Sequence, residues 1–114
     1  MTHYIGCDVH KKYSVFSAVD DRGKTLHHRR VEHDRDNFRL FLDSLPTGSP
    51  IAVETTGNWY WIIDEMEQAG HNPTLAHAAK SKLMMGQINK TDKLDANGLA
   101  MLLRNGTLPS VWIP

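Results

Sequence analysis

Four acidic residues could bind metal ions together: Asp8, Glu54, Asp92 and Asp95. Carboxylate oxygens are the ligands that hard divalent cations such as Mg²⁺ and Mn²⁺ prefer. Two such ions, held roughly 3.5–4 Å apart, can activate an attacking oxygen and stabilise the leaving oxygen when a phosphodiester bond is exchanged. We therefore predict that the four side chains converge on one site that binds two ions of Mg²⁺ or Mn²⁺.

Asp8 lies within HYIGCDV, a short run of strand-forming residues at positions 3–9. Because side chains alternate between the two faces of a strand, Tyr4, Gly6 and Asp8 share one face, and the residues between them share the other. A carboxylate is uncommon inside such a run. The alternative is an ordinary aspartate at the end of a strand, turned toward water.

Glu54 ends the apolar run of residues 50–53 and is followed by Thr55, Thr56 and Gly57. Such a run is typical of a strand that is buried on both faces. Ligand sites in sheets of this kind lie at the carboxyl ends of strands, and Gly57 would allow close approach to the backbone. A solvated glutamate in a loop is the alternative, and Glu54 alone does not decide between the two.

Asp92 and Asp95 are three residues apart in a predicted helix over residues 92–104, so their side chains point the same way. The same face continues with Leu99, Leu102 and Leu103, which form the predicted core-facing stripe. The two acids would then point toward the sheet. A capping box at the helix N-terminus is the competing interpretation, because the helix dipole favours acids there. The two roles are compatible.

The first third of the chain predicts an antiparallel meander. Residues 3–9, 13–19 and 24–33 are rich in strand formers and are joined by polar turns, and the third run has a polar face suited to solvent. The spacing of apolar residues then changes to that of a helix, from Phe38 to Leu45, with Asp34 or Asp36 as its N-cap.

The rest of the chain alternates between strands and helices. Strands are predicted over residues 50–54 and 74–76, and helices over residues 59–69, 78–87 and 92–104. The order predicts an α/β fold, with a mixed five-stranded sheet that begins with the three-stranded antiparallel meander and carries helices on both faces.

Bulk properties indicate one soluble domain, since 114 residues is an ordinary domain length. Thirteen basic and thirteen acidic residues cancel, so the chain lacks the strongly basic character of a self-sufficient nucleic-acid binder. The single cysteine, Cys7, excludes an internal disulfide. With no signal-like or membrane-spanning apolar segment in the sequence, we expect a cytoplasmic protein without a membrane partner.

Three stretches resemble the N-terminal domain of DEDD-type insertion-sequence transposases, a bacterial and archaeal family with an RNase H-like (RuvC-like) catalytic fold. The stretches are YIGCDVHKKYSVFSAVDDRGK, IAVETTGNWYWIIDEMEQAG and KTDKLDANGLAMLLRNG. They occur in the family's order, and KTDKLDA is the most specific. The family's acidic tetrad falls on Asp8, Glu54, Asp92 and Asp95, so the resemblance implies that these residues are catalytic and bind the metal.

The resemblance also implies a DNA transposase, or recombinase, that cleaves and transfers DNA strands when an insertion sequence moves. It implies a structured noncoding guide RNA and a C-terminal domain that carries a nucleophilic serine. We expect the catalytic domain over residues 1–104, the start of a linker over residues 105–114, and a homo-oligomer in the active complex. The 114-residue piece is then expected to fold and bind metal without recombining DNA.

Lysines flank the acidic motifs, where they could contact nucleic-acid phosphates. They are Lys11, Lys12, Lys80, Lys82, Lys90 and Lys93. Taken one at a time, each is better explained as an ordinary solvated lysine. Trp61 falls off the apolar stripe of the helix predicted over residues 59–69, and we predict that it belongs to a surface for a partner.

Three other functions fit part of the pattern. An actin-like phosphotransferase also opens with a Gly-x-Asp hairpin, but it would need further glycine-rich phosphate loops, which the sequence lacks. A nuclease resembling a Holliday-junction resolvase could use the same metal site. A non-catalytic nucleic-acid-binding fragment is the third, and the intact set of four acids argues against it.

Overall fold

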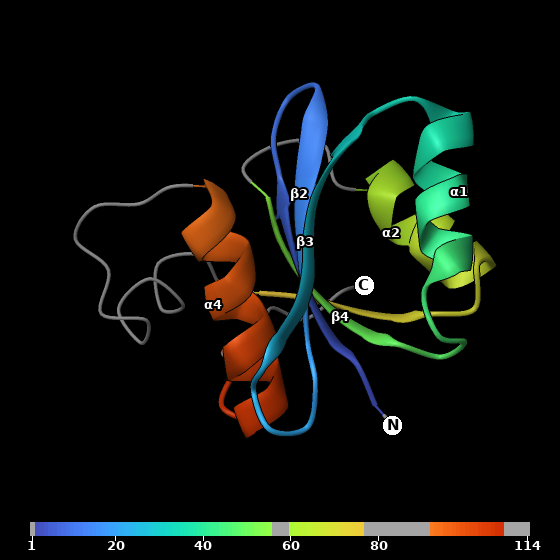
Figure 1. The fold of residues 1–114 in the computed structure, drawn as a ribbon. Helices are drawn as coiled ribbons and strands as arrows, with labels where there is room; N and C mark the ends of the chain where they lie inside the picture. Colours follow the sequence, from blue (N-terminus) through green and yellow to red (C-terminus); the bar gives the residue numbers. More distant parts are fainter. Residues whose placement is uncertain (1, 56–59, 77–91, 109–114) are drawn as a thin grey trace.

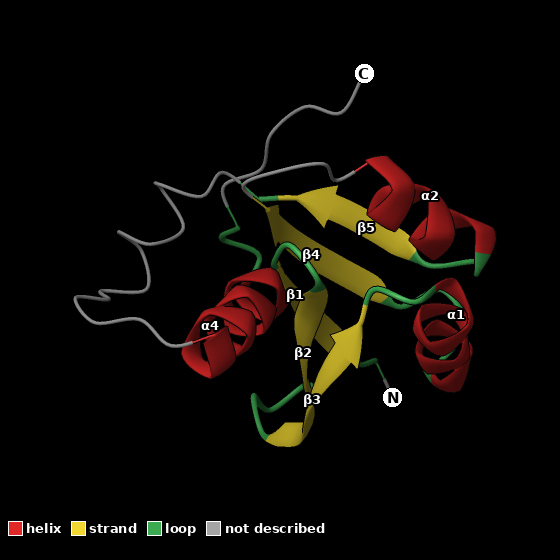
Figure 2. Ribbon diagram, turned by 90° about the horizontal axis from the view of Figure 1, so that it is seen from above, coloured by secondary structure: helices red, strands yellow, loops and turns green. Residues whose placement is uncertain are grey.

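The computed structural model describes residues 2–55, 60–76 and 92–108. Five strands form one sheet in the order β3-β2-β1-β4-β5, with helices packed on it (Figures 1 and 2). Along the chain the elements are β1 (Tyr4–Val9), β2 (Tyr13–Val19), β3 (Thr25–Glu32), α1 (Arg35–Ser44), β4 (Pro50–Thr55), α2 (Tyr60–Gln68), β5 (Asn72–Leu75) and α4 (Asp92–Asn105).

The first three strands form the predicted antiparallel meander. A tight turn joins β1 to β2, and the main-chain N–H of His10 donates to the carbonyl of Tyr13 at 2.8 Å. Lys11 and Lys12 are exposed at the tip of this turn. β3 lies at the edge of the sheet and most of its side chains are exposed, as its polar pattern predicts.

The remaining strands run parallel to β1. β4 pairs with β1, and β5 pairs with β4, each in parallel register. Parallel neighbours need crossover connections, and α1 and α2 lie within those connections. As a result β1, β4 and β5 all end on the same side, which is called here the carboxyl end of the sheet. The β1–β2 turn lies at this end too.

Helices cover both faces of the sheet (Figure 2). On one face α1 and α2 enclose the larger hydrophobic cluster, which includes Phe16, Phe38 and Met66. On the other face α4 packs on a smaller cluster that contains Ala52, Ala76 and Leu99. The predicted α/β architecture, a mixed five-stranded sheet with helices on both faces, is confirmed, and it is compatible with the RNase H-like fold.

α1 begins where the sequence places a cap. The Asp34 carboxylate accepts a hydrogen bond from the main-chain N–H of Asp36 at 3.1 Å, which satisfies one of the donors that a helix start leaves without a partner. Phe38, Phe41 and Leu42 form the buried face of the helix. Asp34, rather than Asp36, is therefore the N-cap.

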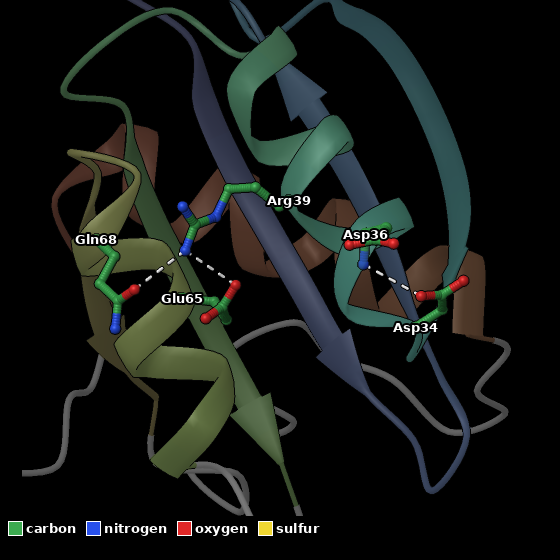
Figure 3. A network of polar contacts seen from close by, with 5 residues as sticks. All are labelled: Asp34, Asp36, Arg39, Glu65 and Gln68. Carbon is green, nitrogen blue, oxygen red and sulfur yellow. Dashed lines mark hydrogen bonds and ion pairs between the residues drawn. The ribbon is translucent and has the colours of Figure 1, made fainter.

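A charged side chain links the two helices on the larger cluster (Figure 3). The Arg39 guanidinium of α1 donates to the carboxylate of Glu65 at 3.0 Å and to the side-chain oxygen of Gln68 at 3.2 Å, both on α2. Only 9% of the Glu65 side chain is exposed, against 35% of Arg39. The pair therefore compensates a carboxylate that is largely removed from water.

Two differences from the sequence-based expectations concern α2 and its surroundings. Trp61 is half-buried, and its ring packs against Phe38 and His33 with centroids 5.2 and 5.1 Å apart. The sequence spacing placed Trp61 off the buried stripe of α2, but α1 and the end of β3 extend the buried side of this helix beyond one stripe. Its part in a surface for a partner stays a prediction. The helix predicted over residues 78–87 lies outside the described residues.

No helix in the described part of the chain is long and apolar enough to cross a membrane.

Replacing Arg39 with methionine should lower the free energy of unfolding by about 1–3 kcal/mol, because Glu65 then stays buried without its ion-pair partner. Chemical denaturation of the purified domain measures the change. The double variant Arg39→Met, Glu65→Leu should recover most of the loss, since it removes the buried charge as well. Arg35→Met, an exposed control on the same helix, should change stability little; an equal loss in that control would contradict this account.

Candidate metal centre

Asp8 and Glu54 lie side by side on neighbouring strands. They are register partners in the parallel β1–β4 ladder, and adjacent strands are about 4.8 Å apart. Side chains of register partners project from the same face of the sheet. Both residues are buried, with 6% and 3% of their surface exposed. The fold thus brings together two carboxyl groups from motifs that are 46 positions apart in the sequence (54 less 8).

The face that carries these two acids is the one that α4 covers. Gly6 lies two positions before Asp8 and shares its face. A Cβ atom added to Gly6 would overlap the carbonyl oxygen of Ala96 and lie 2.8 Å from the main-chain nitrogen of Ala100, both in α4. α4 therefore packs directly on the backbone of β1, at the residue that precedes Asp8 on the same face of the strand.

Two polar side chains set the direction of α4. The side-chain oxygen of Asn97 accepts hydrogen bonds from the hydroxyls of Ser17 in β2 at 3.1 Å and Thr25 in β3 at 3.0 Å. Near the end of the helix, Arg104 donates from Nε to the carbonyl of Asp21 in the β2–β3 turn at 2.7 Å. α4 accordingly ends beside the β2–β3 turn and begins at the carboxyl end of the sheet (Figure 1).

Asp92 and Asp95 belong to the first turn of α4, so the backbone places them at the carboxyl end of the sheet, where Asp8 and Glu54 lie. Their side chains lie outside the described part of the structure. Among the side chains that are described, no three His, Cys, Asp or Glu residues gather as a metal site. The described geometry joins Asp8 with Glu54, and the contribution of the two helix acids stays a prediction.

The chemistry of this pair fits a hard divalent cation. Two neighbouring carboxylates repel each other, and burial strengthens the repulsion because little water screens it. A cation between them would stabilise both, and the all-oxygen donor set suits Mg²⁺ or Mn²⁺. Cys7 does not add a soft ligand, because it lies on the opposite face of β1 and burial strongly raises the pKa of its thiol.

Comparison with known families bears on the role of this centre. The model of the IS110-type DEDD transposases, a family described as transposase, matches residues 5–113. The match covers nearly the whole chain and contains the four acidic residues. The chain belongs to this transposase family. A comparison with curated proteins found no match.

Of the lysines considered for nucleic-acid contact in this transposase domain, two are described fully. Lys11 and Lys12 are exposed in the β1–β2 turn, directly beyond the strand that carries Asp8. The side chain of Lys93, in the first turn of α4, lies outside the described residues, as do Lys80, Lys82 and Lys90. The turn therefore supplies two cations at the carboxyl end of the sheet.

Two side chains that the sequence did not single out take part in this arrangement: one contacts Asp8, and the other holds α4 on the sheet. His10 places Nε2 3.0 Å from Oδ2 of Asp8. Its position two residues after Asp8 was visible, but a lone histidine carries no spacing signal. Asn97 hydrogen-bonds to Thr25 and Ser17, which precede it in the sequence by 72 and 80 positions. No local sequence pattern predicts contacts between residues so far apart.

Gly6→Ala should displace α4 and destabilise the transposase domain by roughly 1–3 kcal/mol, because the new methyl group overlaps the helix backbone. Chemical denaturation measures the loss, and Mn²⁺ titration tests whether the centre is damaged as well. Gly48→Ala is the matched control: its φ of 78° makes alanine unfavourable by roughly 1–2 kcal/mol, but nothing lies within 4 Å of the new carbon. If Gly6→Ala and Gly48→Ala bind metal equally well, the close contact between α4 and β1 has no role in maintaining the metal centre.

Proposed function

We propose that this domain is the catalytic domain of a DNA transposase that cleaves and transfers DNA strands in a metal-dependent reaction when an insertion sequence moves. Asp8, Glu54, Asp92 and Asp95 are the proposed catalytic and metal-binding residues. The observation that carries the proposal is the burial of Asp8 and Glu54 as register partners on the face of the sheet that α4 covers, in a chain of the transposase family.

The four carboxylates would hold two ions of Mg²⁺ or Mn²⁺, which would supply the activation of an attacking oxygen and the stabilisation of a leaving oxygen in phosphodiester exchange. The protein contributes rigid placement. Asp8 and Glu54 extend from strands in the centre of the sheet, whose backbones are fixed by ladders on both sides. Sites built on such elements hold their geometry better than sites on loops.

DNA would approach from the carboxyl end of the sheet. Lys11 and Lys12 are exposed there, next to the acidic pair, and can contact backbone phosphates without reading sequence. Local positive charge of this kind would also reduce the repulsion between the phosphates and the buried carboxylates. The net charge of zero is then compatible with DNA binding, because the cations are placed locally and the remaining contacts would come from partners.

The family resemblance supports further parts of the proposal. A structured guide RNA would pair with DNA, and a C-terminal domain following a linker at residues 105–114 would supply a nucleophilic serine. The active complex would be a homo-oligomer in the cytoplasm. The acidic centre described above and a serine from another domain are chemically complementary, since a metal-bound phosphodiester needs an attacking oxygen.

Mg²⁺ or Mn²⁺ should stabilise this domain against heat, because a ligand that binds only the folded state adds about 2.7 kcal/mol at a concentration about 100 times its Kd. The double variant Asp8→Asn, Asp92→Asn should lose this gain, and Glu54→Gln should weaken it. Thermal denaturation with and without metal measures the shift in Tm.

Asp43→Asn is the control for that titration, because Asp43 is exposed on α1, away from the centre. It should keep the full stabilisation by metal. If the parent domain and the Asp8→Asn, Asp92→Asn variant gain equally from metal, the proposed centre does not exist.

Lys11→Ala, Lys12→Ala should weaken the binding of duplex DNA and lower the steepness of its salt dependence. Each lost phosphate contact should reduce the slope of log K against log salt by about 0.9. Fluorescence anisotropy at several salt concentrations measures both. The double variant Arg22→Ala, Lys24→Ala removes two cations from the β2–β3 turn at the other end of the sheet and should weaken DNA binding less. A larger effect of this second variant would contradict the approach of DNA from the carboxyl end of the sheet.

A further inference from the structure

One histidine lies against the acidic pair. His10 follows β1 directly, and its Nε2 is 3.0 Å from Oδ2 of Asp8. An ionised carboxylate only accepts hydrogen bonds, so Nε2 carries the hydrogen and donates it. A carboxylate offers about four lone-pair positions, so this bond is compatible with cation binding by the same group.

The ring of His10 is itself held in place. It stacks on the ring of Tyr13, with centroids 4.7 Å apart and planes 19° from parallel. The guanidinium carbon of Arg30 lies 3.8 Å from the centre of the Tyr13 ring, and Arg30 Nε donates to Glu32 at 2.7 Å. A row of contacts therefore runs from the exposed strand β3, across the start of β2, to Asp8 in β1.

The turn beneath His10 is fixed from a second direction. The main-chain N–H of His33 donates to the carbonyl of Lys12 at 2.9 Å, and its ring Nε2 lies 2.8 Å from the hydroxyl of Ser14. Two residues that follow His10 are thus anchored to His33, directly after β3, which restricts where the His10 ring can lie.

We propose that His10 is a positioning residue, which orients the carboxylate of Asp8 for metal binding through the hydrogen bond from Nε2. The inference rests on the proposed function, since it assumes that Asp8 binds the ion. Carboxylates that bind metals are themselves commonly hydrogen-bonded, and loss of such an outer contact weakens metal affinity by about 10–100-fold. His10 supplies this contact from a turn that the fold holds rigid.

Two substitutions separate the hydrogen bond from the stacking. His10→Phe keeps an aromatic ring for Tyr13 but removes the donor, whereas His10→Gln keeps an N–H donor and removes the ring. Mn²⁺ titration of the 114-residue domain, followed by the electron paramagnetic resonance signal of free Mn²⁺, gives Kd for each. His10→Phe should raise Kd by about 10–100-fold, and His10→Gln should restore most of the affinity.

Stability in the absence of metal is measured alongside, by chemical denaturation. Equal Kd for the parent and His10→Phe would overturn the proposal, and so would an equal loss in His10→Phe and His10→Gln, because the donor would then be irrelevant. If His10→Phe does not fold, Tyr13→Leu is the second variant. It keeps the donor but removes the ring that orients it, and should raise Kd several-fold; an unchanged Kd would overturn the proposal.

Asp8→Asn distinguishes failure of this inference from failure of the proposed function. If the parent domain binds Mn²⁺ no better than Asp8→Asn, the metal centre itself is wrong. If Asp8→Asn abolishes binding while His10→Phe leaves it intact, the centre stands and His10 has no part in it.

Discussion

The contact between α4 and the backbone of β1 at Gly6 is the constraint on which the arrangement of this domain depends. No side chain separates the helix from the strand there, because even one methyl group would overlap the carbonyl oxygen of Ala96. The residues that meet across this interface are small, and Ala52, Ala96 and Ala100 are fully buried. This close packing lets a helix reach the face on which Asp8 and Glu54 lie.

The two faces of the sheet have different roles: one contains the larger hydrophobic cluster, and the other contains the two buried carboxyl groups. The face under α1 and α2 contains the large aromatic and aliphatic side chains, and the burial of that apolar surface supplies most of the driving force for folding. The face under α4 has a small cluster and two buried carboxyl groups. Burying such groups costs free energy. The larger cluster offsets this cost from the other side of the same strands.

Local sequence patterns predicted the strand or helix on which each acidic residue lies, but each pattern describes only its own element. Strand alternation correctly placed Asp8 on the face of Gly6, and the apolar run before Glu54 correctly indicated a central strand. Helical spacing correctly indicated α4. Trp61 shows the limit of this reasoning. A single apolar stripe describes a helix that packs on one surface, whereas α1 and the end of β3 also pack against the side of α2 that carries Trp61.

The sequence by itself determined the strands and helices that the structure describes, the face of β1 that carries Asp8 and membership in a transposase family, because these follow from periodicity and motifs within short stretches. Only the tertiary structure decided that Asp8 and Glu54 are register partners, that α4 starts at the carboxyl end of the sheet, and that His10 contacts Asp8. Strand order, the direction of a packed helix and the side-chain conformation at a turn depend on contacts between distant residues. The close approach at Gly6 is such a contact, since a glycine is visible in the sequence but the helix that needs it lies about 90 residues away.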